Sequence, residues 1–196
     1  MSAPIQNTRR TESEVDSIFP DRWSPRALSP APIPEEQLRM LFEAARWAPS
    51  CYNEQPWHFV YATSAEGRAH LGEALVEKNR QWALQAPLLM FILARRTFAR
   101  GGKPNRHAPF DAGAAWMSLA IQARRLGLYA HAMAGFSVPK AFQVLGVAEQ
   151  DYEIMAAVAV GRRADPTTLP KDLREMESPN DRKPLSEVAA EFRPGD

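Results

Sequence analysis

The apolar positions between Pro34 and Trp47 recur with the spacing of one face of an α-helix. Leucine, phenylalanine and alanine stand at i, i+3, i+4 and i+7, at Leu38, Leu41, Phe42 and Ala45. Pro34 suits the first helical position, and two glutamates in the first turn face the positive end of the helix dipole. The pattern therefore predicts a helix over residues 34–47, which Pro49 ends.

Two strand patterns flank a second helical pattern. Residues 58–63, HFVYAT, carry the β-branched and aromatic side chains that favour a strand. From about 65 to 85, Leu71, Ala74 and Leu75 share one side of a predicted helix. Residues 87–94, PLLMFILA, are apolar without alternation, which is typical of a strand buried on both faces.

The second half of the chain continues with helices and short strands. Residues 111–126 are apolar around most of a helical circumference, and Gly127 follows as a C-cap, so this helix belongs inside the protein or at a subunit interface. Residues 127–136 indicate a short strand and a turn, 138–146 a short helix, and 152–161 another buried strand. After Gly161, prolines interrupt a charged tail that we expect to lie over a surface.

A chain of 196 residues suits one domain with one sizeable core. Residues 1–17 are polar and aperiodic, so we expect a flexible arm unless a partner subunit holds it, followed by a single domain over residues 18–196. Strands separated by helices without strict βαβ regularity predict an α+β fold, with a mixed sheet covered by helices.

Composition and charge point to a small-molecule partner. The formal net charge of +1 gives no global field that would attract nucleic acid or an anionic membrane. The single cysteine cannot form an intrachain disulfide, and neither a leader-like segment nor a long apolar run is present. These features predict a cytoplasmic protein with no nucleic-acid or membrane partner.

Several common chemistries lack their sequence signature. No G-x-G-x-x-G follows a strand, and RGGKPN at 100–105 fails as a phosphate loop, because its first glycine is missing and Pro104 stands where Ser or Thr would bind magnesium. The four histidines and Cys51 show no zinc-ligand spacing, so we predict no metal site. A hydrolase built around Ser50 or Cys51 stays open as an alternative, although a lone cysteine is more often structural.

Three polar clusters remain, and they follow a familiar order. They are DRWSPRAL at 21–28, APSCYNEQPW at 48–57 and SPNDRKPLSE at 178–187. Together with the G-F pair at 135–136, they resemble the motifs of the FMN-dependent nitroreductase family from about Phe19 to Glu187. NEQPW, KPNRH and LYAHAMAGF are most similar to the branch that contains flavin reductases and nitroreductases of unsettled substrate.

The resemblance implies a nitroreductase-like fold, with a mixed or antiparallel central sheet flanked by helices. It also implies an intertwined homodimer with FMN at the subunit interface. In the first cluster the family pattern assigns Arg22, Trp23, Ser24 and Arg26 to the flavin. Arg22 and Ser24 would serve the phosphate and ribityl end, and Arg26 the N1/O2 edge of the ring. Residues 22, 24 and 26 alternate in an extended segment, so their side chains should face one side.

The other clusters complete the implied flavin site. Arg182 and Lys183 would close on the phosphate, while Asn53 and Gln55 would meet the pyrimidine edge of the partner subunit's flavin. Pro49 and Ser50 would approach that ring closely. In AMAGF at 132–136, the backbone N–H of Ala134 or Gly135 would be directed at flavin N5, and Met133 would pack on the ring or in the core.

The electron donor and acceptor would meet the flavin in an open cleft. Trp82 and His107 are candidates for its substrate face, and the basic loop 94–107 is either a binding loop for an anionic substrate or an ordinary solvated loop. Glu54 has no assigned role.

The resemblance predicts an FMN-dependent oxidoreductase. NADH or NADPH would give a hydride to N5, and a nitroaromatic, quinone or flavin acceptor would then take the electrons in a ping-pong cycle. No side chain is required as a catalytic acid, because the flavin carries the chemistry. The alternative from another class is a flavin-binding sensor or storage protein without turnover.

Overall fold

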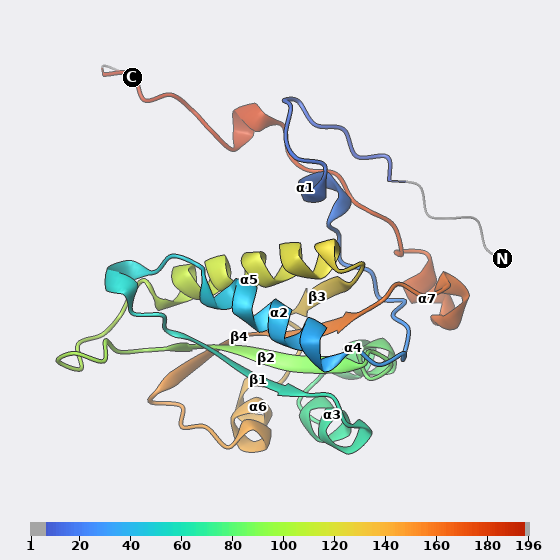
Figure 1. Ribbon diagram of the computed structural model, residues 1–196, viewed down its shortest axis with the longest axis horizontal. Helices are drawn as coiled ribbons and strands as arrows, with labels where there is room; N and C mark the ends of the chain where they lie inside the picture. The colour runs from blue at the N-terminus through green and yellow to red at the C-terminus, as the bar shows by residue number, and fades with distance from the viewer. Residues whose placement is uncertain (1–6, 195–196) are drawn as a thin grey trace.

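A four-stranded antiparallel sheet forms the centre of the fold. The computed structural model describes residues 7–194, so the first six residues of the predicted arm lie outside the described part. The strands run in the order β1 (Trp57–Ala62), β2 (Leu88–Arg95), β4 (Tyr152–Gly161) and β3 (Tyr129–Met133). All neighbours pair antiparallel, which confirms the predicted α+β class (Figure 1).

Strand β2 separates two apolar layers. Helices α2 (Glu35–Arg46) and α5 (Ala108–Arg125) cover one face of the sheet, and α3 (Ala65–Gly72), α4 (Glu77–Ala83) and α6 (Val138–Leu145) cover the other (Figure 1). Successive residues of β2 belong alternately to the two layers, with Leu88, Met90 and Ile92 on one side and Leu89, Phe91 and Leu93 on the other. The strand is buried on both faces, as its unbroken apolar run predicts.

The predicted helix over residues 65–85 is two helices rather than one. Between α3 and α4 the chain leaves the helical path and pairs with the turn after β3. Ser137 N–H donates to the carbonyl of Ala74 at 2.8 Å, and Val76 N–H donates to the carbonyl of Gly135 at 3.1 Å. These long-range backbone hydrogen bonds carry no periodic signal, so the local pattern missed the break.

The ends of α5 follow the local chemistry of the chain. The helix begins at Ala108, three residues before the predicted start, with a proline in its first turn. It ends before Gly127, whose φ of +72° is the left-handed conformation expected of a C-capping glycine. Among the described residues, no helix is long and apolar enough to cross a membrane.

The two terminal segments run away from the sheet side by side (Figure 1). Short helix α1 (Ile18–Asp21) rests on the end of α5, where Arg124 Nη2 donates to Asp21 Oδ2 at 2.5 Å. The tail forms α7 (Lys171–Arg174) between two 3-10 turns, Pro166–Thr168 and Leu185–Glu187. Beyond residue 180 the described part of the tail is exposed in the single chain, so a surface that it would cover is not part of this chain's own core.

Candidate functional site

A hollow of about 430 Å³ opens beside the end of β3. Its wall combines the start of α4, the turn after β3, Arg26 and two residues near α7. It gathers four of the residues that the sequence predicted to hold a flavin, namely Arg26, Met133, Ala134 and Gly135. The structure therefore brings together the first polar cluster and the AMAGF turn.

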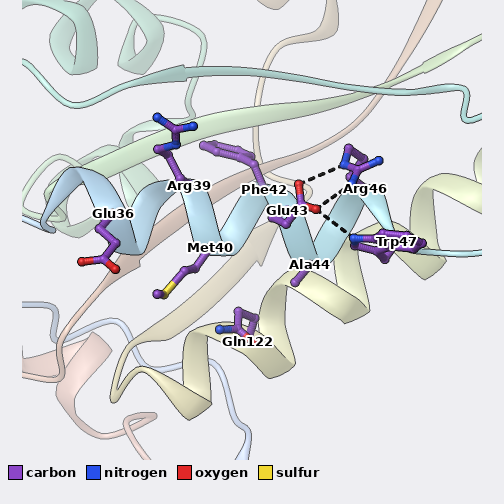
Figure 2. Close-up of a pocket in the computed structure, with 9 residues that line it drawn as sticks. All are labelled: Glu36, Arg39, Met40, Phe42, Glu43, Ala44, Arg46, Trp47 and Gln122. Carbon is purple, nitrogen blue, oxygen red and sulfur yellow. Dashed lines mark hydrogen bonds and ion pairs between the residues drawn. The ribbon is translucent and has the colours of Figure 1, made fainter.

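A larger hollow of about 710 Å³ runs along the outer side of α2 and contains none of the predicted site residues (Figure 2). Three of its polar groups bond one another, since Glu43 accepts hydrogen bonds from Arg46 and from Trp47 Nε1. These hydrogen bonds lower the pKa of Glu43 to about 2. The carboxylate of Glu43 is thus already paired with Arg46, and none of the predicted site residues lines this hollow, so we place the candidate site at the smaller one.

The segment from Arg22 to Arg26 alternates as its sequence predicts. Trp23 and Pro25 are buried, whereas Arg22, Ser24 and Arg26 are partly exposed. The Trp23 ring packs edge-on against Tyr129 with centroids 6.2 Å apart, so this side chain belongs to the core and does not line the hollow. We call residues 22–26 the arginine strip.

A buried carboxylate that the sequence did not reveal fixes the end of this strip. The Glu177 side chain is fully buried, and its two oxygens accept the N–H of Arg26 at 2.9 and 3.0 Å. Oε1 also accepts the N–H of Ala27 at 2.9 Å, and Arg26 Nη1 lies 4.0 Å from Oε2. Glu177 therefore joins the tail to the strip and holds Arg26 at the hollow, although its surroundings in the sequence read as an ordinary charged tail.

The turn after β3 is held against α4. Both Val76 N–H and Asn79 Nδ2 donate to the carbonyl of Gly135, the latter at 3.0 Å. A Cβ added to Gly135 would lie 2.4 Å from Asn79 Nδ2, so a larger residue here would have to displace the amide that donates to the Gly135 carbonyl. The backbone at Ala134 and Gly135 is thus a fixed part of the hollow's wall, as a backbone donor to a ligand requires.

Beneath the hollow lies a histidine–tryptophan pair that has no role in the sequence motifs. His131 donates from Nδ1 to the carbonyl of Pro25 at 3.1 Å, and its ring lies 4.6 Å from that of Trp82. Burial lowers the pKa of His131 to about 4, with a smaller contribution from the positive charge of Arg26. Trp82, predicted to face the substrate, is 1% exposed and sits in the core under His131, because α4 turns it toward β2.

The second polar cluster precedes β1 at the end of the sheet opposite to α4 and α7 (Figure 1), and residues of α4 and α7 line the hollow. Its turn is tightly cross-linked: Ser50 Oγ accepts the N–H of Gln55 at 2.9 Å, and Gln55 Nε2 donates to the carbonyl of Asn53. Tyr52, Asn53 and Gln55 have left-handed φ values of 53°, 57° and 51°, an unfavourable conformation for residues with side chains. Within one chain, Pro49, Ser50, Asn53 and Gln55 do not meet the arginine strip.

Glu54 ties this turn to the basic loop. Its Oε1 accepts the N–H of Ala99 at 2.5 Å, and the neighbouring Tyr52 ring meets Phe98 edge-on. His107 occupies the N-cap position of α5 without a hydrogen bond from its side chain to the helix end. One turn later, the Asp111 carboxylate accepts the N–H of Cys51 at 3.1 Å. Two cations of the loop are already engaged, because Arg95 bonds the hydroxyl of Tyr152 and Arg96 bonds backbone carbonyls.

The three cations predicted to bind the flavin phosphate, one in the arginine strip and two in the tail, differ in their surroundings. Arg22 is half-buried, its Nε is buried without a partner among the described residues, and burial followed by repulsion from Arg182 lowers its pKa. Arg182 therefore stands close enough to Arg22 for the two charges to oppose each other. Lys183 is exposed and pairs with Glu187 at 3.4 Å, so in the single chain it points away from this pair.

Comparison with known proteins identifies the family to which this chain belongs. A model described as the nitroreductase family matches residues 20–81 and 74–162. The chain belongs to the nitroreductase family.

Individual relatives agree with this assignment. A crystal structure described as an oxidoreductase containing FMN is 43% identical in sequence and superimposes with a TM-score of 0.91. The superposition covers 97% of this chain and 98% of that chain. A Streptomyces coelicolor protein, named provisionally as an NADH dehydrogenase/NAD(P)H nitroreductase, is 28% identical over 76% of this chain and 83% of its own. An FMN-dependent nitroreductase of Clostridium difficile, 20% identical with a TM-score of 0.66 over 77% of this chain and 88% of its own, shares the fold.

The buried hydrogen bonds of Glu177 predict that a conservative substitution at this position lowers the free energy of unfolding. Glu177→Gln keeps the shape of the side chain but replaces one acceptor oxygen with an NH₂ group that faces backbone donors. We expect the free energy of unfolding, measured by urea denaturation, to fall by about 2–4 kcal/mol. The matched change Glu175→Gln, at an exposed position, should alter it by less than about 0.5 kcal/mol. Equal losses in both variants would contradict the anchoring role.

The low pKa of His131 predicts a pH dependence of stability. The unfolded chain binds this proton near the ordinary pKa of 6.5, and the folded chain binds it only near 4, so protons favour unfolding in that interval. Stability should fall from pH 6.5 to 4 and level off below, by up to about 3 kcal/mol from this group. Urea denaturation across this range should give a steeper loss for the wild type than for His131→Asn. Parallel curves would show that His131 is not buried in its neutral form.

Proposed function

We propose that the chain is an FMN-dependent oxidoreductase that takes electrons from NADH or NADPH. The observation that carries the proposal is the arginine strip itself, which starts at an uncompensated cationic pair, Arg22 and Arg182, and ends at the hollow beside Arg26. The relative that contains FMN, at 43% identity over nearly the whole chain, supports the choice of cofactor.

The residues of the strip suit the parts of FMN. Arg22, with its buried unpaired Nε, and Arg182 offer guanidinium donors to a phosphate monoester. The four residue steps of extended chain from Arg22 to Arg26 span about 13 Å, which is of the order of the distance between the phosphate and the near edge of the ring. Ser24 faces the same side and would meet the ribityl chain. Lys183 would join the phosphate only after leaving Glu187.

The ring end of the site is held by fixed groups. When bound, FMN would accept a hydride at N5 and pass two electrons to a nitroaromatic, quinone or flavin acceptor in a ping-pong cycle. Arg26 would stabilise negative charge at the N1/O2 edge, while Glu177 holds its backbone in place. The backbone at Ala134 and Gly135 would present its N–H to N5, and Met133, 4% exposed, would support the ring from the core side.

A homodimer would complete the site. The turn at residues 49–55 lies far from the strip of its own chain, so its polar groups would serve the flavin of the partner subunit. Large apolar side chains near this turn stand in solvent in the single chain: Tyr52 is 90% exposed, Phe110 80% and Trp47 74%. Burial of such side chains on association would offset the strained backbone of the turn.

The basic loop would reach the same cleft, because Glu54 ties it to the turn. Among its described cations, Arg100, Lys103 and Arg106 make no ion pair, in contrast to Arg96, which pairs with Glu153. We propose that they attract the phosphates of the nicotinamide donor, and that His107 lines the cleft from the end of α5.

Reduction by the nicotinamide donor tests the function. The protein, purified with or reconstituted in FMN, should lose its yellow colour within seconds when NADH or NADPH is added without oxygen, and regain it when a quinone follows. FMN retention without bleaching by either donor would indicate a flavin-binding module without turnover. Failure to bind FMN at all would contradict the proposal as a whole.

The place of Arg26 predicts the redox potential of a variant. Arg26→Gln deletes a positive charge that favours reduced flavin, so the two-electron midpoint potential should fall. A unit charge at about 4 Å in a partly screened site contributes roughly 4 kcal/mol at most, and Glu177 offsets part of it. Half that value corresponds to a decrease of about 40 mV. Dye-equilibrated titration measures it, with Arg39→Gln on exposed α2 as the control. An unchanged or higher midpoint potential with FMN bound would show that Arg26 does not lie at the N1/O2 edge of the flavin.

A further inference from the structure

Arg9, in the segment whose sequence predicts only a flexible arm, connects the two ends of the chain. Its Nε donates to the carbonyl of Asn180 at 2.7 Å and its Nη2 to Asn180 Oδ1 at 3.1 Å. From the other side, Nη1 donates to the carbonyls of Pro20 at 3.0 Å and Arg22 at 2.7 Å. One guanidinium thus bridges the first residue of the arginine strip and the tail just before Arg182.

This bridge needs an arginine rather than any cation. A guanidinium presents five N–H donors in a planar fork, which here meet four acceptors on two segments. An ammonium group has three donors on one atom and cannot span both segments in the same geometry. The acceptors are all uncharged, so the bridge leaves the positive charge of Arg9 in place.

The bridge gathers like charges that would otherwise separate. The pKa of Arg9 is lowered by burial, then by Arg182 and Arg22, against a smaller opposing effect of Asp181 and Asp21. Three guanidiniums therefore lie close together with net repulsion. Besides the Arg9 bridge, the exposed tail meets the N-terminal segment at Leu185, whose N–H donates to Glu12 Oε1 at 3.1 Å. A bound dianion at this place would relieve the repulsion.

We propose that Arg9 is a positioning residue, which latches the tail onto the arginine strip and so assembles the phosphate end of the flavin site. The inference rests on the proposed function and deepens it: Arg9 makes the protein select a flavin that carries a phosphate monoester. Without the latch, Arg182 leaves Arg22, and FMN loses its advantage over riboflavin. The ring end, held by Glu177 and the turn after β3, stays intact.

Binding of FMN and of riboflavin to the full-length apoprotein tests this role. Flavin fluorescence titration should show that Arg9→Gln weakens FMN binding by about 10- to 100-fold while riboflavin binding changes less than about threefold. Arg9→Lys should behave like Arg9→Gln, because charge alone does not form the bridge. Arg10→Gln is the matched control: the Arg10 side chain is exposed and makes no hydrogen bond or ion pair with the described residues, so the variant should bind both flavins like the wild type. Asn180→Ala, which removes one acceptor only, should give an intermediate loss of FMN.

The outcomes separate this inference from the function on which it rests. An FMN-to-riboflavin affinity ratio in Arg9→Gln equal to that of the wild type overturns the latch and leaves the oxidoreductase proposal standing. Full FMN affinity in Arg9→Lys overturns it too, since charge and not bridging would then suffice. Wild-type protein that binds neither flavin overturns both. If Arg9→Gln fails to fold, Asn180→Ala decides, and an unchanged ratio in that variant counts against the latch.

Discussion

The hydrogen bonds between the Glu177 carboxylate and the backbone of residues 26 and 27 determine where the candidate site lies. A fully buried carboxylate is stable only when hydrogen-bond donors or opposite charge surround it. Here two main-chain N–H groups donate to it, and the positive charge of the Arg26 guanidinium lies 4.0 Å away. Because the acceptor comes from the tail and the donors come from the strip, neither segment can settle without the other. Both segments contribute to the wall of the hollow beside β3, through Arg26 from the strip and through Leu173 and Met176 from the tail.

The body of the protein provides a rigid base for this arrangement. The alternation along β2 builds two apolar layers on one sheet, and β3 extends that sheet to the edge at which the strip lies. Ion pairing between Arg124 and Asp21 fixes the entry to the strip, and Arg124 also lies over the Tyr129 ring at 3.9 Å. The site is therefore carried by the sheet and the end of α5, while its cationic part belongs to the two chain ends.

Much of the fold was predictable because its signals are local. Helix α2 and strands β2 and β4 follow from apolar spacing alone, and Gly127 ended α5 as its position predicts. The break between α3 and α4 was missed because backbone pairing with residues 135–137 produces it. The strip, the turn after β3 and their common hollow were predicted through family motifs. Glu177, His131 and Arg9 were not, since each acts through contacts with residues more than 100 positions away.

The distance between the two predicted parts of the site determines which flavin a mutation in one chain would affect in the proposed homodimer. Each chain carries the strip for one flavin and the turn for the other, so a defect at one end of a chain spoils a different site from a defect at its other end. In a mixed dimer of one chain defective in the strip and one defective in the turn, both lesions fall on the same flavin. The second flavin then meets an intact strip and an intact turn. Two variant chains that are each inactive alone would therefore form a mixed dimer in which one of the two flavin sites is intact.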